Sequence, residues 1–292
     1  MADPLEYFRQ LCRHPSDAIR WSCVLEATSP KAGNVYPGQE FGDLSYLDFI
    51  TAAEIAAKHL ADSTRSYAQR ILDCVQATQT TSGTNVNLGI LLLLGPLVAA
   101  DQSAKFRSSA EWSPVIARQL DLGPQESRLI FQAISESSPG GLGTVSEMDV
   151  QDQQSHEDII AAMRLAKHRD RVARQYADGF DDLINNVLPV LYHSIVESAD
   201  VLRGIAVAHL RLLAETPDTL IARKSGELSA KAVQERAARV EVSDFNGCLK
   251  FDRSLRSDDH HLNPGTTADL IAGALYVLLR TPTRGSGPAR KP

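Results

Sequence analysis

Four short polar stretches hold the residues that could do chemistry, at positions 28–34, 82–89, 218–226 and 263–269. Each joins carboxylates, cations, amides or hydroxyls to a glycine and adjoins an apolar helical segment. Oxygen ligands of this kind suit Mg²⁺, which binds a few carboxylates and keeps waters or substrate phosphates in its shell. Cations beside them suit phosphate oxygens. The combination predicts a site for a polyphosphate substrate that is bridged by Mg²⁺.

The candidate residues of this site fall into three sets. The predicted metal ligands are Glu26, Asp218 and Asp269. The predicted general bases, which the sequence does not rank, are Asp48, Asp149 and Asp218. The predicted substrate-binding residues are Lys31, Gly33, Asn34, Ser82, Thr84, Asn85, Asn87, Arg223, Lys224, Asn263, Gly265, Thr266 and Thr267.

Purely structural roles are the alternative interpretation of the same residues. Asp218 would then cap the segment after Pro217, because its side chain can accept from the free amides of a first helical turn. Lys31 would be an exposed lysine on its loop. The residues that would become turn residues or solvated charges are Asn85, Asn87, Arg223 and Lys224.

The stretch 263–269 leads into the predicted core helix from Thr267 to Arg280. Gly265 allows close backbone approach, and Thr266 or Thr267 is expected to cap the helix. Asp269 is expected in the first turn, where the helix dipole favours a carboxylate. The segment after it is apolar nearly all round, which is typical of a helix inside a core.

Helical periodicity also covers most of the remaining chain. The predicted helices are 16–26, 46–60 with Ser45 as its cap, 65–79, a segment from Val86 that Pro96 kinks or ends, 126–136, 157–214 with breaks near Gly179 and Asp200, and 227–240. Segment 241–251 is ambiguous, and no convincing alternating strand or fixed repeat occurs. We predict an all-α fold of roughly ten or more helices, with the polar site built from the loops between them. The predicted division is a single helical domain over 1–280 and a disordered tail over 281–292.

Composition excludes several classes of protein. The 292 residues are 43% hydrophobic and 23% charged, as in ordinary globular proteins, and the net charge of −6 argues against a general nucleic-acid binder. The four cysteines form no CxxC pair, and the most apolar run, 88–100, is too short to span a bilayer. Because residues 1–15 carry charges and no apolar run, we expect no signal peptide, a cytoplasmic location, reduced thiols and no membrane partner.

The four stretches resemble, in order, the signatures of the triphosphoribosyl-dephospho-CoA synthases. Residues 26–35, EATSPKAGNV, resemble the family's E-x-[ST]-x-P-K-P-G-x-V, and residues 84–89, TNVNLG, resemble its G-V-N-T-H-K-G. Asp218 and Thr219 with residues 223–226, RKSG, resemble D-T-N-x-x-x-R-G-G, and residues 263–269, NPGTTAD, resemble S-P-G-G-S-A-D. Each block is weak alone, but four in order over about residues 20–280 are fairly specific.

The resemblance implies an all-α, Mg²⁺-dependent enzyme that moves the triphosphoribosyl group of ATP to the 2′-hydroxyl of 3′-dephospho-CoA and releases adenine. Its expected partners are ATP and a coenzyme-like acceptor, and a homodimer is one oligomeric state that stays open. Displacing adenine passes through an oxocarbenium-like state that a carboxylate can stabilise. The acceptor hydroxyl needs a base, and the leaving adenine needs a proton.

Two departures from the signatures make the chain look like a divergent branch. The family's R-G-E-A-x-x-G-F-P segment has no counterpart in this sequence. Residues 140–150, which stand near its place, do not match it. The histidine and lysine of N-T-H-K-G are replaced by residues such as Asn87 and Leu88. Three alternatives therefore stay open: ribosyl transfer to another acceptor in a one-carbon coenzyme pathway, hydrolysis of an N-ribosyl bond, and a non-catalytic nucleotide-binding helical module.

Overall fold

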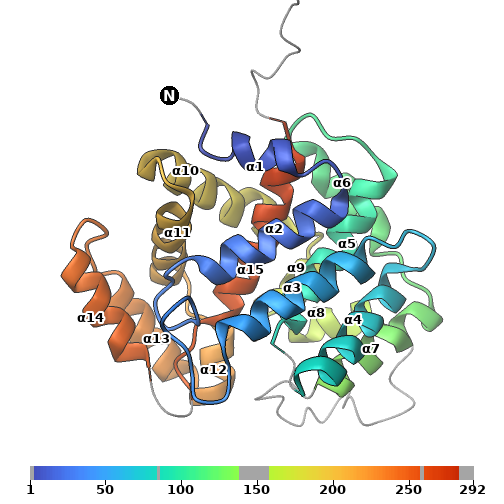
Figure 1. The fold of residues 1–292 in the computed structure, drawn as a ribbon. Helices are drawn as coiled ribbons and strands as arrows, with labels where there is room; N and C mark the ends of the chain where they lie inside the picture. Colours follow the sequence, from blue (N-terminus) through green and yellow to red (C-terminus); the bar gives the residue numbers. More distant parts are fainter. Residues whose placement is uncertain (1–2, 84–85, 138–157, 257–259, 283–292) are drawn as a thin grey trace, which may run out of the picture.

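The computed structural model describes residues 3–83, 86–137, 158–256 and 260–282 (Figure 1). The described residues form fifteen α-helices and no β-strand, which confirms the all-α prediction. The helices are α1 (Glu6–Leu11), α2 (Pro15–Thr28), α3 (Tyr46–Leu60), α4 (Tyr67–Ser82), α5 (Leu88–Ser103), α6 (Trp112–Gln119), α7 (Pro124–Ser137), α8 (Ile159–Ala166), α9 (Arg171–Ala177), α10 (Leu188–Ser198), α11 (Val201–Glu215), α12 (Thr219–Ser225), α13 (Glu227–Ala237), α14 (Phe245–Leu255) and α15 (Gly265–Arg280). A 3₁₀ turn, η1 (Ser109–Glu111), precedes α6, and a π-helical turn, η2 (Leu183–Val187), precedes α10.

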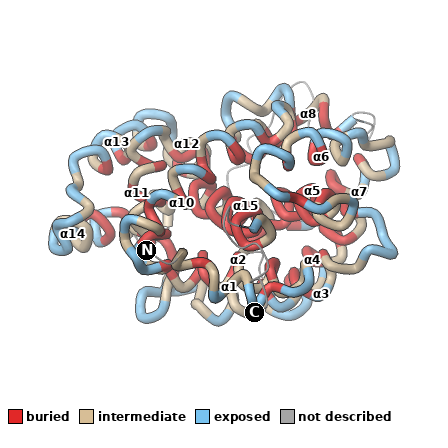
Figure 2. Tube along the Cα trace, turned by 90° about the horizontal axis from the view of Figure 1, so that it is seen from above, coloured by how far each residue is buried: buried red, intermediate tan, exposed pale blue. Residues whose placement is uncertain are grey.

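Helix α15 lies at the centre of the molecule, as its apolar sequence predicts. It packs against α2, α5, α10, α11 and α12, and these helices surround it in both views (Figures 1 and 2). From Leu270 to Leu279 every residue of α15 is buried. A helix that is apolar on all sides is stable only where neighbours cover every side. The N-terminal end of α15 is therefore held firmly, and the polar stretch 263–269 sits at that end.

Two hydrophobic clusters make up the core. The larger cluster joins α1–α11 and α15. The smaller cluster lies between α11, α12, α13 and α14 and is built around residues such as Leu213, Ile221 and Phe251. Loop residues Ala32 and Leu262 pack on the smaller cluster, which places parts of the stretches 28–34 and 260–264 beside it. That residues 1–280 form one domain stays a prediction.

Helix α3 starts as predicted, and α2 does not. The Ser45 hydroxyl and the Asp48 carboxylate form a reciprocal capping box at α3, with the Ser45 amide donating to Asp48 Oδ2 at 2.8 Å. Helix α2 begins at Pro15, one residue before the predicted cap Ser16, and its capping box pairs His14 with Asp17. Proline at the first position explains the difference, since its fixed φ and missing amide suit a helix start.

Pro96 lies inside α5, which continues to Ser103, so the prediction that this proline could end the helix is wrong. A proline has no amide hydrogen, and the carbonyl four residues earlier loses its helical partner. That carbonyl belongs to Leu92, and the buried Tyr176 hydroxyl of α9 donates to it at 2.7 Å. The tyrosine thus replaces the missing donor and ties α9 to α5.

Other differences concern the boundaries of the later helices. The predicted segment 157–214 has the expected breaks after α9 and after α10, together with a further break over 167–170 that the periodicity did not predict. The ambiguous segment 241–251 contains the start of α14. Helix α15 begins at Gly265, two residues earlier than predicted, so Asp269 lies in its second turn rather than its first.

The start of the predicted tail is anchored. The Thr281 hydroxyl accepts a hydrogen bond from Trp112 Nε1 at 2.9 Å, and residues 283–292 lie outside the described part of the chain. Within the described ranges, no helix combines the length and the apolar character that crossing a membrane requires.

Replacing Leu278 by aspartate is expected to unfold the protein. Leu278 is 6% exposed in α15, and an unpaired charge buried there costs more than about 4 kcal/mol of the free energy of unfolding. Leu228→Asp is the matched control, since Leu228 is 86% exposed on α13 and its replacement should leave the melting temperature unchanged. Soluble, cooperatively melting Leu278→Asp protein would show that the account of α15 is wrong.

Candidate functional site

The N-terminal ends of α5 and α15 meet at Asp269. A Cβ atom added to Gly89 would lie 2.0 Å from Asp269 Oδ2, so only glycine lets α5 approach the carboxylate this closely. The Asp269 carboxylate makes no hydrogen bond or ion pair with any other described residue. It is therefore a carboxylate that is held in place by packing and is free to bind something else.

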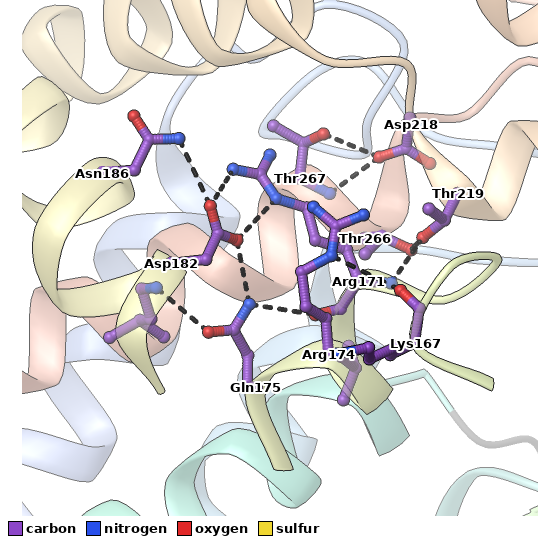
Figure 3. A network of polar contacts seen from close by, with 12 residues as sticks. Lys167, Arg171, Arg174, Gln175, Asp182, Asn186, Asp218, Thr219, Thr266 and Thr267 are labelled. Atoms are coloured by element: carbon purple, nitrogen blue, oxygen red, sulfur yellow. Dashed lines mark hydrogen bonds and ion pairs between the residues drawn. The ribbon is translucent and has the colours of Figure 1, made fainter. Parts of the chain in front are cut away.

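Asp218, by contrast, uses both of its oxygens to join two helices. Its Oδ1 accepts from the amides of Leu220 at 2.8 Å and Ile221 at 3.2 Å and so caps α12. Its Oδ2 accepts from both the amide and the hydroxyl of Thr267 in α15, each at 2.7 Å (Figure 3). The alternative interpretation, in which Asp218 caps the segment after Pro217, is confirmed, and its predicted catalytic and metal-binding roles remain predictions. The expected side-chain cap of α15 by Thr266 or Thr267 is wrong, because Asp218 accepts from the amide in its place.

A row of hydrogen bonds extends this junction to α9. The amide of Arg171 donates to the Thr219 hydroxyl at 3.2 Å, and that hydroxyl contacts the Thr266 hydroxyl at 3.2 Å. Arg171 also donates to Asp182 through Nε at 2.8 Å and Nη2 at 2.9 Å, and Gln175 donates to the same carboxylate (Figure 3). These contacts fix the starts of α9, α12 and α15 relative to one another.

Arg223, in the last turn of α12, lies between two carboxylates. It forms an ion pair with Asp170, which also caps α9 through the amides of Val172 and Ala173. The charge of Asp269 acts on Arg223 as well. The neighbouring Lys224 is half-buried, and its side chain makes no hydrogen bond or ion pair with the described residues.

Lys31 is completely buried, so the interpretation of it as an exposed lysine is wrong. Its ammonium group lies 2.9 Å from Glu26 Oε1 and also donates to the backbone carbonyls of Glu26 and Ser29. Glu26 is 5% exposed at the end of α2. A buried ion pair of this kind is stable only when its partners stay hydrogen-bonded, and here the Glu26 carbonyl of α2 and the Ser29 carbonyl of the loop are the extra acceptors for Lys31.

The rest of this loop is fastened by α14 and by the stretch 263–269. Asn34 Nδ2 donates to Asn263 Oδ1 at 2.6 Å, which joins two of the predicted stretches directly. The amide of Gly33, whose φ is +75°, donates to Asp252 Oδ1 at 2.8 Å. Arg256 pairs with Asp252 at 2.9 Å and donates to the Asn34 carbonyl at 2.8 Å. Residues of α14 therefore hold the loop in place.

Electrostatics mark Asp269 as the centre of the site. Burial of its carboxylate, which packs on Gly89 although the residue as a whole is half-buried, raises the pKa of Asp269 well above its usual range. The negative charges of Glu26 and Asp218 raise this pKa further, and Arg223 opposes them. A carboxylate under such repulsion gains stability when a cation approaches. Asp269 is thus suited to face a metal ion or a developing positive charge.

His209 of α11 is buried beside the same ion pair. Both ring nitrogens lack a hydrogen bond that meets normal geometry, although the imidazole lies near the Pro264 carbonyl. Burial, followed by the positive charge of Lys31, lowers the pKa of His209 to about 3. The imidazole is consequently neutral and packs behind the site rather than acting in it.

Acidification is expected to cost about 2 kcal/mol of the free energy of unfolding through His209 between about pH 7.5 and 5. Its ordinary pKa is 6.5 and its folded pKa is about 3, so the unfolded state binds more protons between these values. This contribution is fully present above the unfolded pKa and is lost as the pH falls. Urea unfolding of the parent and of His209→Leu at the two pH values measures it. An equal pH dependence in both proteins would contradict the assignment.

Most of the predicted site residues come together, and some do not. Those linked by the contacts above are Glu26, Lys31, Gly33, Asn34, Asp218, Arg223, Asn263, Thr266, Thr267 and Asp269. Gly265 packs on Leu220 of α12, and Asn87 is the buried residue that precedes α5. Asp48 serves the cap of α3, and Ser82 is the last residue of α4, with no side-chain hydrogen bond to the described residues. Thr84, Asn85 and Asp149 lie outside the described residues.

The predicted set of three metal ligands is not preformed. The described ranges contain no group of three or more His, Cys, Asp or Glu side chains that could hold a metal ion. The physical reason is visible in the contacts: Asp218 is committed to helix amides, and Glu26 is paired with Lys31.

Sequence reasoning missed several residues that build the site. Asp252 and Arg256 hold the loop 28–34, and their acid–base spacing of four residues on a helix was the available signal. Asp170 and Arg171 join α9 to α12, and nothing in the local pattern indicated their partners. His209 lies within the predicted helical segment 157–214, and nothing in that segment indicated Lys31 as its neighbour.

Comparison with known proteins gives one family and several relatives. A model of the ATP:dephospho-CoA triphosphoribosyl transferase family matches residues 12–286. Two curated relatives are each provisionally named 2-(5''-triphosphoribosyl)-3'-dephosphocoenzyme-A synthase. The one from Pseudomonas syringae pv. syringae (strain B728a) is 26% identical over 205 residues, which cover 68% of this chain and 62% of the relative. The one from Pseudomonas paraeruginosa (strain DSM 24068 / PA7) is 26% identical over 217 residues, covering 70% and 62%.

The chain thus spans about 62% of the length of the curated relatives it matches. A crystal structure from Archaeoglobus fulgidus, provisionally described as a triphosphoribosyl-dephospho-CoA synthase, superposes with a TM-score of 0.63. The superposition covers 79% of this chain and 98% of that one, with 19% sequence identity. At this identity the likeness establishes a shared fold.

Proposed function

Because the chain belongs to the ATP:dephospho-CoA triphosphoribosyl transferase family, we propose that it moves the triphosphoribosyl group of ATP to the 2′-hydroxyl of 3′-dephospho-CoA. The observation that carries the proposal is the family match over residues 12–286, which includes all four polar stretches. The geometry supports it, since Gly89, Glu26, Asp218 and Arg223 all act on one carboxylate without a hydrogen bond to the described residues, Asp269, and the buried Lys31 pairs with Glu26.

The reaction breaks the C1′–N9 bond of ATP and forms a bond between C1′ and the acceptor oxygen. The acceptor hydroxyl loses its proton, and adenine leaves with one proton, so atoms and charges balance. Positive charge develops on the ribosyl ring in the transition state, and a preorganised carboxylate stabilises it. Such a carboxylate acts best where competing hydrogen bonds are absent, and Asp269 makes none with the described residues.

Mg²⁺ fits the donor chemistry of this site as a companion of the triphosphate. Mg²⁺ is usually bound by one or two carboxylates together with substrate phosphates. Asp269 makes no hydrogen bond with the described residues, and of the other predicted ligands Glu26 has the stronger electrostatic effect on it. When bound, the ion would neutralise charge on the phosphate oxygens. Asp218 is left out of the proposed metal contacts because its oxygens cap α12 and α15.

The remaining groups position the substrate in this proposal. Arg223 lies beside Asp269 and would contact phosphate oxygens, while Lys31 keeps Glu26 in place. Asn34 and Asn263 form a hydrogen-bonded pair just before the start of α15. Among the three predicted bases, Asp48 and Asp218 have carboxylates committed to helix caps. Asp149 lies outside the described residues, and its role as the base remains a prediction.

Adenine release from ATP tests the proposal. We expect release that depends on 3′-dephospho-CoA and that stops when EDTA removes divalent cations. The control reaction replaces the acceptor by coenzyme A, whose 3′-phosphate alters the ribose that receives the group. Release at the same rate without any acceptor would indicate hydrolysis, and no release under any condition would contradict the proposed activity.

A further inference from the structure

Arg169 stands next to the site without an ion-pair partner of its own. It lies in the break between α8 and α9, is exposed, and forms no ion pair with the described residues. The two residues that follow it are both fastened to α12. Asp170 pairs with Arg223, and the amide of Arg171 donates to the Thr219 hydroxyl. Arg169 is therefore held beside the start and the last turn of α12.

Arg169 and Arg223 are close enough to act on each other. Burial lowers the pKa of Arg223, and the positive charge of Arg169 lowers it further, whereas Asp269 opposes the change. Arg223 Nε is buried and has no hydrogen-bond partner. The Asp170 carboxylate pairs with Arg223 and also caps α9, and no carboxylate of the described residues pairs with Arg169.

The unpaired guanidinium of Arg169 and the buried, unpartnered Nε of Arg223 therefore leave unused donors of two positive groups beside each other. Like charges repel strongly where water is partly excluded, and an anion between them removes the repulsion. Guanidinium groups bind phosphate oxygens with two parallel hydrogen bonds, which makes phosphate the best-matched anion. Because the charge of Asp269 acts on Arg223, the anion would be close to the proposed reaction centre.

We propose that Arg169 and Arg223 together hold the phosphate chain of the nucleotide donor, with Arg169 as the residue that determines affinity for it. The proposal rests on the proposed function for the identity of the donor. It names the part of the substrate that this side of the site recognises. The acceptor also carries a diphosphate, so the same chemistry has a second source that the test must separate.

Inorganic tripolyphosphate is the probe for the donor, and 3′-dephospho-CoA is the probe for the acceptor. Calorimetry on the full chain should show tripolyphosphate binding weakened by about 10–100-fold in Arg169→Ala, as expected for one lost charged contact. Binding of 3′-dephospho-CoA should stay within about twofold of the parent, far below that loss. The control is Arg118→Ala, which removes an exposed arginine from α6, beyond the opposite end of α5, and should change neither affinity.

Each outcome decides the matter. Equal tripolyphosphate binding by Arg169→Ala and Arg118→Ala would overturn the proposal, and selective loss of acceptor binding would overturn its assignment to the donor. If the parent protein releases adenine and Arg169→Ala still binds tripolyphosphate normally, the proposed function stands and this inference is wrong. If the parent protein binds tripolyphosphate through Arg169 but never releases adenine, this inference stands and the proposed function is wrong.

Discussion

Replacing Asp269 by asparagine is expected to lower the rate of adenine release by about 10²–10³-fold, the usual loss of one preorganised electrostatic contact. The amide keeps the shape of the side chain and removes its charge. Since the carboxylate makes no hydrogen bond within the described residues, the substitution removes no stabilising hydrogen bond from the fold. Burial and the negative charges of Glu26 and Asp218 also disfavour the charged form of Asp269 in the free protein. The melting temperature should stay the same or rise.

Asp218→Asn is the matched control, and its expected effect is on the fold. Four hydrogen bonds converge on the Asp218 carboxylate, two on each oxygen. An amide can accept on one side only, so two donors of α12 or α15 lose their partner, at a cost of about 3 kcal/mol in the free energy of unfolding. Thermal melting and adenine release are measured on both variants, at saturating Mg²⁺.

The pair of variants separates a chemical carboxylate from a structural one. Asp269→Asn protein that releases adenine within about threefold of the parent rate would fall far short of the expected loss and remove Asp269 from the reaction. An Asp218→Asn variant that melts like the parent would show that the double cap contributes little.

Replacing Gly89 by alanine is expected to lower adenine release by about 10²-fold, because displacing a catalytic group by about 1 Å has that effect. The added Cβ would lie 2.0 Å from Asp269 Oδ2, so the carboxylate must move. Alanine is the better helix former by up to about 1 kcal/mol, and the variant should therefore stay folded. The strain of the added Cβ against Asp269 offsets this gain, so the melting temperature is not expected to rise while activity falls.

Two further proteins make this result specific. Gly42→Ala adds a methyl group where nothing lies within 4 Å and should leave the rate unchanged. In an Asp269→Ala background, Gly89→Ala should cause no additional loss, because its effect acts through the missing carboxylate. Additive losses in the double variant would mean that Gly89 acts in another way.

Most helices could be predicted from the sequence because their apolar faces repeat at helical spacing. The exceptions have identifiable causes. Helix α5 continues through Pro96 because Tyr176, 84 positions after Leu92, donates to the Leu92 carbonyl, and no local pattern contains that information. Segment 241–251 was ambiguous because the buried face of α14 is narrow, with only Phe251 and Leu255 as its buried apolar residues.

The sequence predicted which loops form the candidate site, but it did not predict the role of each residue in them. The polar stretches and their glycines indicated where the chain would converge, and the contact between Asn34 and Asn263 joins two of them. What each carboxylate does depends on partners far along the chain. Asp218 accepts from Thr267, 49 positions away, and Asp252 accepts from Gly33, 219 positions away. Sequence spacing predicted the same metal-binding role for Asp218 and Asp269. The hydrogen bonds show that the Asp218 carboxylate joins two helices and that the Asp269 carboxylate does not.

Mass spectrometry of the reaction products tests the central claim most directly. Purified protein, ATP, Mg²⁺ and 3′-dephospho-CoA are incubated together, and adenine and the acceptor are quantified in the same samples. The account predicts one adenine released for each acceptor that gains a triphosphoribosyl group, with both signals lost in Asp269→Asn. Adenine that appears with free ribose triphosphate and an unmodified acceptor, or an Asp269→Asn protein that forms the adduct at the parent rate, would contradict it.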